Sequence, residues 1–180
     1  MPNWATGTVT VTGTKEAIAS FVERFVSEDE ERTIPGKKYF ARSFLEDKRG
    51  QVIGEIPNPE PGTDTVTFTF PVSFAWSAYC CIISGYPEKF QDECLTLVEA
   101  CLQDHVLVQI QTIEYGMCFE EDMTCTEDGV LLHISKDLIE VKCPICGNIQ
   151  SIGSIEEPND SYCWECGHEG LVLVETEDKK

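Results

Sequence analysis

Two short cysteine motifs in the last quarter of the chain carry its strongest chemical signal. Each reads Cys-x-x-Cys-Gly, and 16 residues separate Cys146 of the first from Cys163 of the second. Two residues between thiolates let a tight turn aim both sulfurs at one ion, and the glycine permits the positive φ that closes the turn. The spacing therefore predicts that Cys143, Cys146, Cys163 and Cys166 hold one structural Zn²⁺ ion in tetrahedral S₄ coordination.

Two alternatives to structural zinc remain open from the residues alone. The same four sulfurs suit iron, which would make this part of the chain a rubredoxin-like electron carrier. Free or disulfide-linked cysteines are the other alternative, and a reducing compartment disfavours the disulfide. Catalytic zinc is not expected, because a closed Cys₄ shell leaves no coordination position for water. His168 follows the second motif and is interpreted as a spectator.

The remaining polar residues do not predict catalysis, so we expect no enzyme. His105 and His133 are interpreted as packed histidines, one at the start of a strand and one within a strand. The pair Cys80-Cys81 has no basic neighbour that would lower a thiol pKa. A run of acids does not follow the spacing of an EF-hand and is interpreted as a solvated acidic face. These acids are Glu120, Glu121, Asp122, Glu127 and Asp128.

The cysteine motifs lie in a segment too small to fold by burial of apolar side chains alone. Residues 141–180 number about 40, a size at which a metal is usually needed, and structural zinc contributes about 10–16 kcal/mol. Ile149 and Ile152 flank a turn expected at residues 151–154, and Leu171 to Val174 supply a final strand. The segment is therefore predicted to be a zinc ribbon.

Residues 1–140 alternate between two periodicities. Thr65 to Phe70 alternates threonine with apolar residues, as strands with one buried face do, whereas Ile18, Phe21 and Val22 recur at helical spacing. The order is strand, helix, strand, strand, helix, strand and an extra hairpin, which predicts a ferredoxin-like α+β sandwich. The expected strands are Thr8 to Thr12, Lys38 to Phe44, Thr65 to Phe70, Val106 to Ile113 and Val130 to Ile134. The expected helices follow Thr14 as far as Phe25 and Pro87 as far as Gln103, with Cys94 and Cys101 as core thiols.

The chain is strongly acidic throughout, with 32 Asp and Glu against 13 Lys and Arg and a formal charge of −19. Residues 1–140 carry 24 acids and 10 bases, and residues 141–180 carry 8 acids and 3 bases. Phosphate backbones should be repelled over most of such a surface. Residues 37–49 are the basic exception, interpreted first as a solvated strand pair and second as an anion-binding patch.

An uncharged stretch at residues 65–87 is the one candidate for a membrane span, and its pattern argues against that reading. Pro71 interrupts it, and the alternation of threonine with Val66, Phe68 and Phe70 is that of a strand. We interpret the stretch as core. The first residues lack the basic and apolar segments of a secretory signal, so a cytoplasmic location is expected.

Several short motifs carry a resemblance to a known family. They are Pro2-Asn3-Trp4, a Thr/Val strand ending at Gly13, Phe74-Ala75-Trp76-Ser77 and Tyr86-Pro87. With them, residues 2–115 resemble the YubB-type ferredoxin-like domain family. The resemblance implies a ferredoxin-like fold, frequent occurrence in phages, plasmids and integrated elements, and no established enzymatic activity. The residues themselves favour core or edge packing for Trp4 and Trp76.

Three classes of function follow from these observations. The leading hypothesis is a non-enzymatic, zinc-binding accessory protein of a mobile element that binds a basic protein partner, since a charge of −19 favours such a partner. In its sharper form, the acidic surface inhibits a host defence factor or a nucleic-acid-binding factor by mimicking nucleic acid. Direct nucleic-acid binding by the ribbon and sheet is the second class, and an iron electron carrier is the third.

Overall fold

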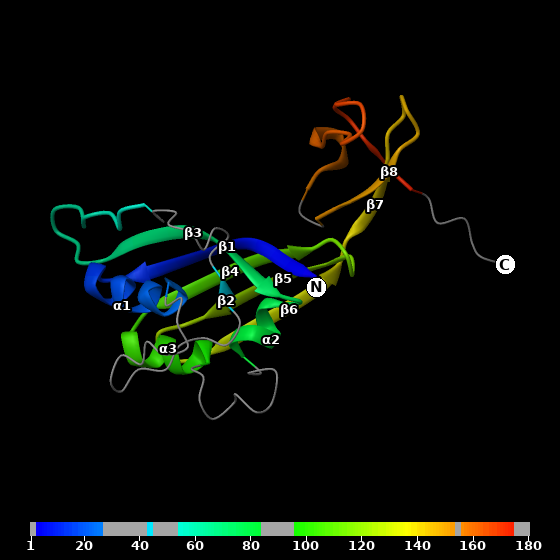
Figure 1. Ribbon diagram of the computed structural model, residues 1–180. Coiled ribbons are helices and arrows are strands. Elements are labelled where there is room, and N and C mark those ends of the chain that lie inside the picture. The colour runs from blue at the N-terminus through cyan, green and yellow to red at the C-terminus, as the bar shows by residue number, and fades with distance from the viewer. Residues whose placement is uncertain (1–2, 27–42, 45–53, 84–95, 154–155, 175–180) are drawn as a thin grey trace.

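The computed structural model describes residues 3–26, 43–44, 54–83, 96–153 and 156–174, and these form two antiparallel sheets (Figure 1). The larger sheet has the strand order β2-β3-β1-β4-β5-β6, and the smaller has the order β8-β7-β9. The first group of elements is β1 (Trp4–Gly13), α1 (Lys15–Val26), β2 (Ser43–Phe44), β3 (Val66–Ala75), α2 (Ala78–Ile82), α3 (Leu97–Asp104), β4 (Leu107–Glu114), β5 (Phe119–Cys125) and β6 (Leu131–Asp137). The second is β7 (Ile139–Lys142), β8 (Ile149–Ile152), the 3-10 helix η2 (Pro158–Asp160) and β9 (Val172–Leu173).

Alternating side chains give the large sheet one core face and one open face. Val9 and Val11 of β1 are fully buried, and the threonines between them pair across the open face. The Thr10 and Thr69 hydroxyls lie 2.8 Å apart, and those of Thr12 and Thr67 lie 3.1 Å apart. Helices α1, α2 and α3 lie along the core face (Figure 1). The fold is therefore α+β, as the alternating periodicities predicted.

Two strands of the large sheet, β1 and β3, are longer than their sequence patterns indicated. β1 begins at Trp4, and β3 continues through Pro71 to Ala75. Pro71 is exposed, and the described part of β2 pairs only with Ser73 and Phe74. A proline is tolerated in a strand where no neighbour needs its missing N–H.

The second predicted helix is wrong at Thr96, its part before Thr96 lies outside the described residues, and a short helix was not predicted. Thr96 has extended backbone and caps α3, because its hydroxyl accepts from the Glu99 N–H while Glu99 Oε2 accepts from the Thr96 N–H. α2 was not expected. Cys101 is buried as predicted, but Cys94 lies outside the described residues. His105 does not begin a strand, since it ends α3 with φ +53°.

The acidic segment after β4 is a strand, not a solvated face. Glu120 and Glu121 of β5 are only 6% and 3% exposed. Glu121 Oε2 accepts from the Ala78 N–H at 2.8 Å, and Glu121 Oε1 lies 3.2 Å from His133 Nε2. The predicted solvated face is therefore wrong for these two residues; for Glu121, the backbone N–H of Ala78 on α2 provides a buried hydrogen bond that the sequence pattern does not reveal.

The small sheet follows the large one directly, since Leu138 alone separates β6 from β7. The boundary predicted between residues 140 and 141 stays a prediction, and β7 crosses it. Residues 151 and 152 lie in β8, so the turn predicted to begin at residue 151 is wrong there. Most of the basic segment 37–49 lies outside the described residues. None of the described helices is long and apolar enough to span a membrane.

Candidate metal centre

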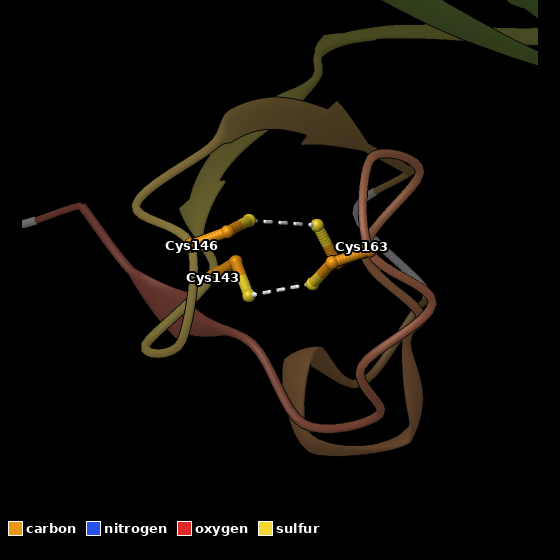
Figure 2. Close-up of side chains that lie close together, drawn as sticks. Cys143, Cys146 and Cys163 are labelled. Carbon is orange, nitrogen blue, oxygen red and sulfur yellow. Dashed lines mark hydrogen bonds between the residues drawn. The ribbon is translucent and has the colours of Figure 1, made fainter.

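Four cysteine sulfurs converge in the small sheet, and the sequence predicted all four. The Sγ atoms of Cys143, Cys146, Cys163 and Cys166 all lie within 4.8 Å of one another. Cys143 Sγ is 3.7 Å from Cys166 Sγ, and Cys146 Sγ is 3.5 Å from Cys163 Sγ (Figure 2). Tetrahedral coordination with metal–sulfur bonds of about 2.3 Å separates sulfurs by about 3.8 Å. The tetrad is therefore positioned to bind one metal ion.

The two cysteine turns have the same backbone geometry. In the first, the Gly147 N–H donates to the Cys143 carbonyl at 3.0 Å, and the Cys143 N–H donates to the Asn148 carbonyl at 2.8 Å. In the second, the Gly167 N–H donates to the Cys163 carbonyl and the Cys163 N–H to the His168 carbonyl, both at 2.8 Å. The glycines have φ of +77° and +71°, a region that other residues adopt at a cost. Each turn thus aims its two sulfurs by backbone geometry alone.

Backbone N–H groups and neighbouring sulfurs lower the pKa of some thiols in the tetrad, whereas the pKa of others is raised. Desolvation opposes ionisation of Cys163, but the N–H groups of Cys166 and Glu165 outweigh it and lower the pKa to about 6. The Asn148 N–H lowers the pKa of Cys146, but desolvation and the three neighbouring sulfurs raise it to about 12. A metal ion that binds these four sulfurs must displace the protons that the thiols carry.

A small apolar cluster packs against two cysteines of the tetrad. Val141, Ile152 and Leu171 are buried together with Cys143 and Cys163. Cys143 directly follows the end of β7. Within β7, Val141 and Lys142 pair with residues of both β8 and β9. The cluster contains so few side chains that burial alone stabilises it weakly, which is why a bound ion matters here.

A buried amide, which the sequence analysis missed, fixes the residues on either side of Cys163. Gln150 is 6% exposed, and its Nε2 donates to the Tyr162 carbonyl at 2.9 Å. Its Oε1 accepts from the Trp164 N–H at 3.0 Å and from Asn148 Nδ2 at 3.3 Å. The sequence offered only a weak signal for this residue, because a glutamine in a short strand that begins and ends with isoleucine looks the same whether its side chain is buried or solvated.

The other candidate histidines and cysteines contribute no side chain to the tetrad in the described part of the chain. His168 supplies its carbonyl to the Cys163 N–H, and the four-sulfur group does not include its side chain. His133 stacks on Tyr79 with ring centroids 4.6 Å apart and contacts Glu121, which agrees with its interpretation as a packed histidine. Cys81 is buried on α2.

Aromatic side chains join the small sheet to the large one beside the metal centre. The rings of Tyr115 and Trp164 meet edge to face, with centroids 5.7 Å apart. Desolvation and the nearby carboxylate of Glu156 raise the pKa of Tyr115. Gly153 packs so closely on the large sheet that a Cβ there would lie 3.0 Å from Glu120 Oε2. The second cysteine turn is thus in contact with the turn between β4 and β5.

The donor set determines what the centre can do. Four thiolates at tetrahedral spacing fill the shell of a zinc or iron ion and leave no open position at which water could be activated. In the described part of the chain, this is the one group of cysteine, histidine and acidic residues that could hold a metal ion. No family model, curated protein or solved structure matches the chain.

Proposed function

We propose that the protein is a non-enzymatic, zinc-binding accessory protein that binds a basic protein partner. The tetrad carries the proposal, because its paired sulfurs at 3.5 and 3.7 Å form a closed S₄ shell that suits a structural ion. The ion would be held by Cys143, Cys146, Cys163 and Cys166, and it would stabilise the small sheet.

Zinc is proposed over iron because of what surrounds the sulfurs. Cys146 and Cys166 are exposed, and the apolar cluster covers only the other two cysteines. Solvent exposure of two of the four sulfurs favours a structural role over a tuned redox centre. An iron-loaded tetrad would make the aerobically purified protein coloured, whereas a zinc-loaded one is colourless.

A basic protein partner is proposed because of charge. At −19, a chain of 180 residues attracts basic surfaces and repels phosphate backbones within about one Debye length, a distance that is longest at low salt. Mimicry of nucleic acid toward a host defence factor is the sharpest form of this proposal. A cytoplasmic location and an origin in a phage or another mobile element belong to the same proposal, and the resemblance to the YubB-type family implies the second.

The ferredoxin-like assignment of the large sheet is also proposed. Its support is the strand order β2-β3-β1-β4 with every neighbouring pair antiparallel, together with helices on one face. β5 and β6 extend this arrangement as a hairpin at the β4 edge. The resemblance to the YubB-type family agrees with this topology and stays a prediction.

The experiment is an affinity capture from the native host at about 50 mM and about 300 mM salt, with identification of bound protein and nucleic acid and with metal analysis of the bait. A basic protein captured in one-to-one amount at low salt and lost at high salt would support the proposal. Capture of nucleic acid with no bound protein would overturn the proposal in favour of direct nucleic-acid binding. Iron at one equivalent would overturn the zinc assignment.

A further inference from the structure

Beside the second cysteine turn lies a groove of about 430 Å³ with aromatic and acidic walls. We call it the Trp164 groove. Its lining includes Gln150, Glu156, Glu157, Asp160, Tyr162 and Trp164. The volume falls within the range of about 300–1,000 Å³ that is usual for ligand pockets.

The aromatic walls are exposed although the adjacent backbone is fixed. Tyr162 and Trp164 are 57% and 65% exposed, large values for side chains of this size in a folded region. Gln150 binds the Tyr162 carbonyl and the Trp164 N–H, and the Tyr115 ring meets the edge of the Trp164 ring. A buried amide thus fixes the backbone that carries both rings, and the Trp164 ring also contacts Tyr115, which lowers the entropy lost when a ligand covers them.

The charged side chains that line the groove are all acidic. Its charged lining residues are Glu156, Glu157 and Asp160, all exposed, and no Lys or Arg among the described residues lines it. Glu156 lies close enough to raise the pKa of Tyr115, which places a carboxylate at the aromatic end of the groove. Ring faces beside carboxylates attract a cation both through the ring quadrupole and through charge.

We propose that the Trp164 groove binds the cationic side chains of a basic protein segment, with an arginine or lysine placed between Trp164, Tyr162 and Glu156. This inference rests on the proposed function and names the surface that the basic partner would occupy. Arginine suits the groove because its planar guanidinium stacks on aromatic faces while it pairs with carboxylates.

The test uses the metal-loaded full chain and a defined probe. Acetylated, amidated penta-arginine is titrated into ¹⁵N-labelled protein, with the uncharged penta-citrulline peptide as control. The Trp164 indole N–H resonance is identified by its loss in Trp164→Phe. We expect this resonance to shift with penta-arginine and not with penta-citrulline. An unmoved Trp164 resonance at saturating penta-arginine would overturn the proposal.

Matched variants separate the groove from the overall charge. We expect Trp164→Ala, and the double variant Glu156→Gln with Glu157→Gln, each to weaken penta-arginine binding at least about fivefold. The controls are Glu127→Gln with Asp128→Asn, which removes the same charge at the far turn of β5 and β6, and Ile145→Ala on the first cysteine turn. Each control should change the Kd less than about twofold. If the control pair weakened penta-arginine binding as much as the groove pair, net charge alone would bind the peptide, and the proposal would be overturned.

Two readouts keep this inference distinct from the proposed function. Metal content of every variant, expected at one ion per chain, excludes loss of the small sheet as the cause of weaker binding. If the wild type and the groove variants capture the same basic protein equally well from the host, the groove proposal fails and the proposed function stands. If penta-arginine binds at Trp164 but the wild type captures no protein, the proposed function fails and the groove stands.

Discussion

At the scale of single residues, the sulfur tetrad has no spare ligand among the residues that the structure describes. The four-sulfur group contains no fifth cysteine, histidine or carboxylate, and the His168 side chain lies outside it. A serine oxygen binds zinc far less well than a thiolate, and three sulfurs leave the shell open. Replacement of any one ligand should therefore abolish tight binding.

The first prediction is that Cys163→Ser loses the bound ion. We expect metal content to fall from one ion per chain to less than about 0.1 after dialysis against a weak chelator, since most of the ~10–16 kcal/mol of binding depends on a complete shell. Elemental analysis measures this loss. Cys118→Ser is the control, because Cys118 is exposed and lies outside the tetrad, and it should keep a full equivalent. Full metal content in Cys163→Ser would remove that cysteine from the ligand set.

A second residue-scale prediction concerns the buried carboxylate of Glu121. Glu121→Leu leaves the Ala78 N–H without its acceptor and His133 without its partner. The expected loss is about 2 kcal/mol in the free energy of unfolding, the usual cost of a buried donor left unpaired. Urea denaturation followed by circular dichroism measures it. Glu127→Leu, at an exposed turn position, should cost less than about 0.5 kcal/mol, and equal costs would contradict the role given to Glu121.

At the scale of elements, the close approach of β1 and β4 depends on a residue without a side chain. A Cβ at Gly7 would lie 1.9 Å from the Gln111 carbonyl oxygen and 2.8 Å from the Thr112 Cα. Both atoms belong to backbone in the middle of the sheet, which cannot move aside without breaking its pairing. Gly7 therefore sets the spacing of two central strands.

We predict that Gly7→Ala destabilises the large sheet by about 3 kcal/mol or more, because the clash is with backbone and not with a flexible side chain. The midpoint of urea unfolding measures the effect. Thr8→Ala is the matched control, since Thr8 is the exposed neighbour on the same strand. Its midpoint should stay close to that of the wild type. An unchanged midpoint in Gly7→Ala would contradict the packing of β1 against β4.

The elements that the sequence predicted well are those whose pattern is local. Val9 and Val11 alternate with threonines and lie in β1, and the two Cys-x-x-Cys-Gly motifs meet as expected. The errors lie where contacts distant in sequence decide the outcome. Glu121 is buried because the N–H of Ala78, 43 residues away, binds it. Gln150 is buried because Tyr162 and Trp164 bind it, and no short window contains both partners.

At the scale of the whole molecule, the two sheets have separate cores. The cluster beneath the large sheet and the cluster of Val141, Ile152 and Leu171 beneath the tetrad share no residue among those described. Only the small cluster contains metal ligands. Loss of the ion should therefore act on one sheet and spare the other.

We predict that a strong chelator removes amide protection from β7 and β8 while β1 and β4 stay protected. The physical reason is that the small cluster needs the free energy of metal binding, whereas the large core includes Phe21, Phe70 and Phe74 at 1% exposure or less. Hydrogen exchange with mass spectrometry measures both sheets in one experiment. Cys163→Ser without chelator should give the same pattern. Loss of protection across both sheets would show that they form one cooperative unit.

The single residue between β6 and β7 bears on how tightly the protein could hold the proposed partner. Leu138 is buried, and its N–H donates to the Cys118 carbonyl at 2.9 Å, so no flexible tether joins the two halves. A target that touches both halves meets them at a preset distance, and the second contact forms at the high effective concentration of a short, stiff connection. Targets of another shape gain nothing from that second contact. Insertion of a few glycines after Leu138 would therefore let the two halves contact targets of more shapes, with lower selectivity among those targets.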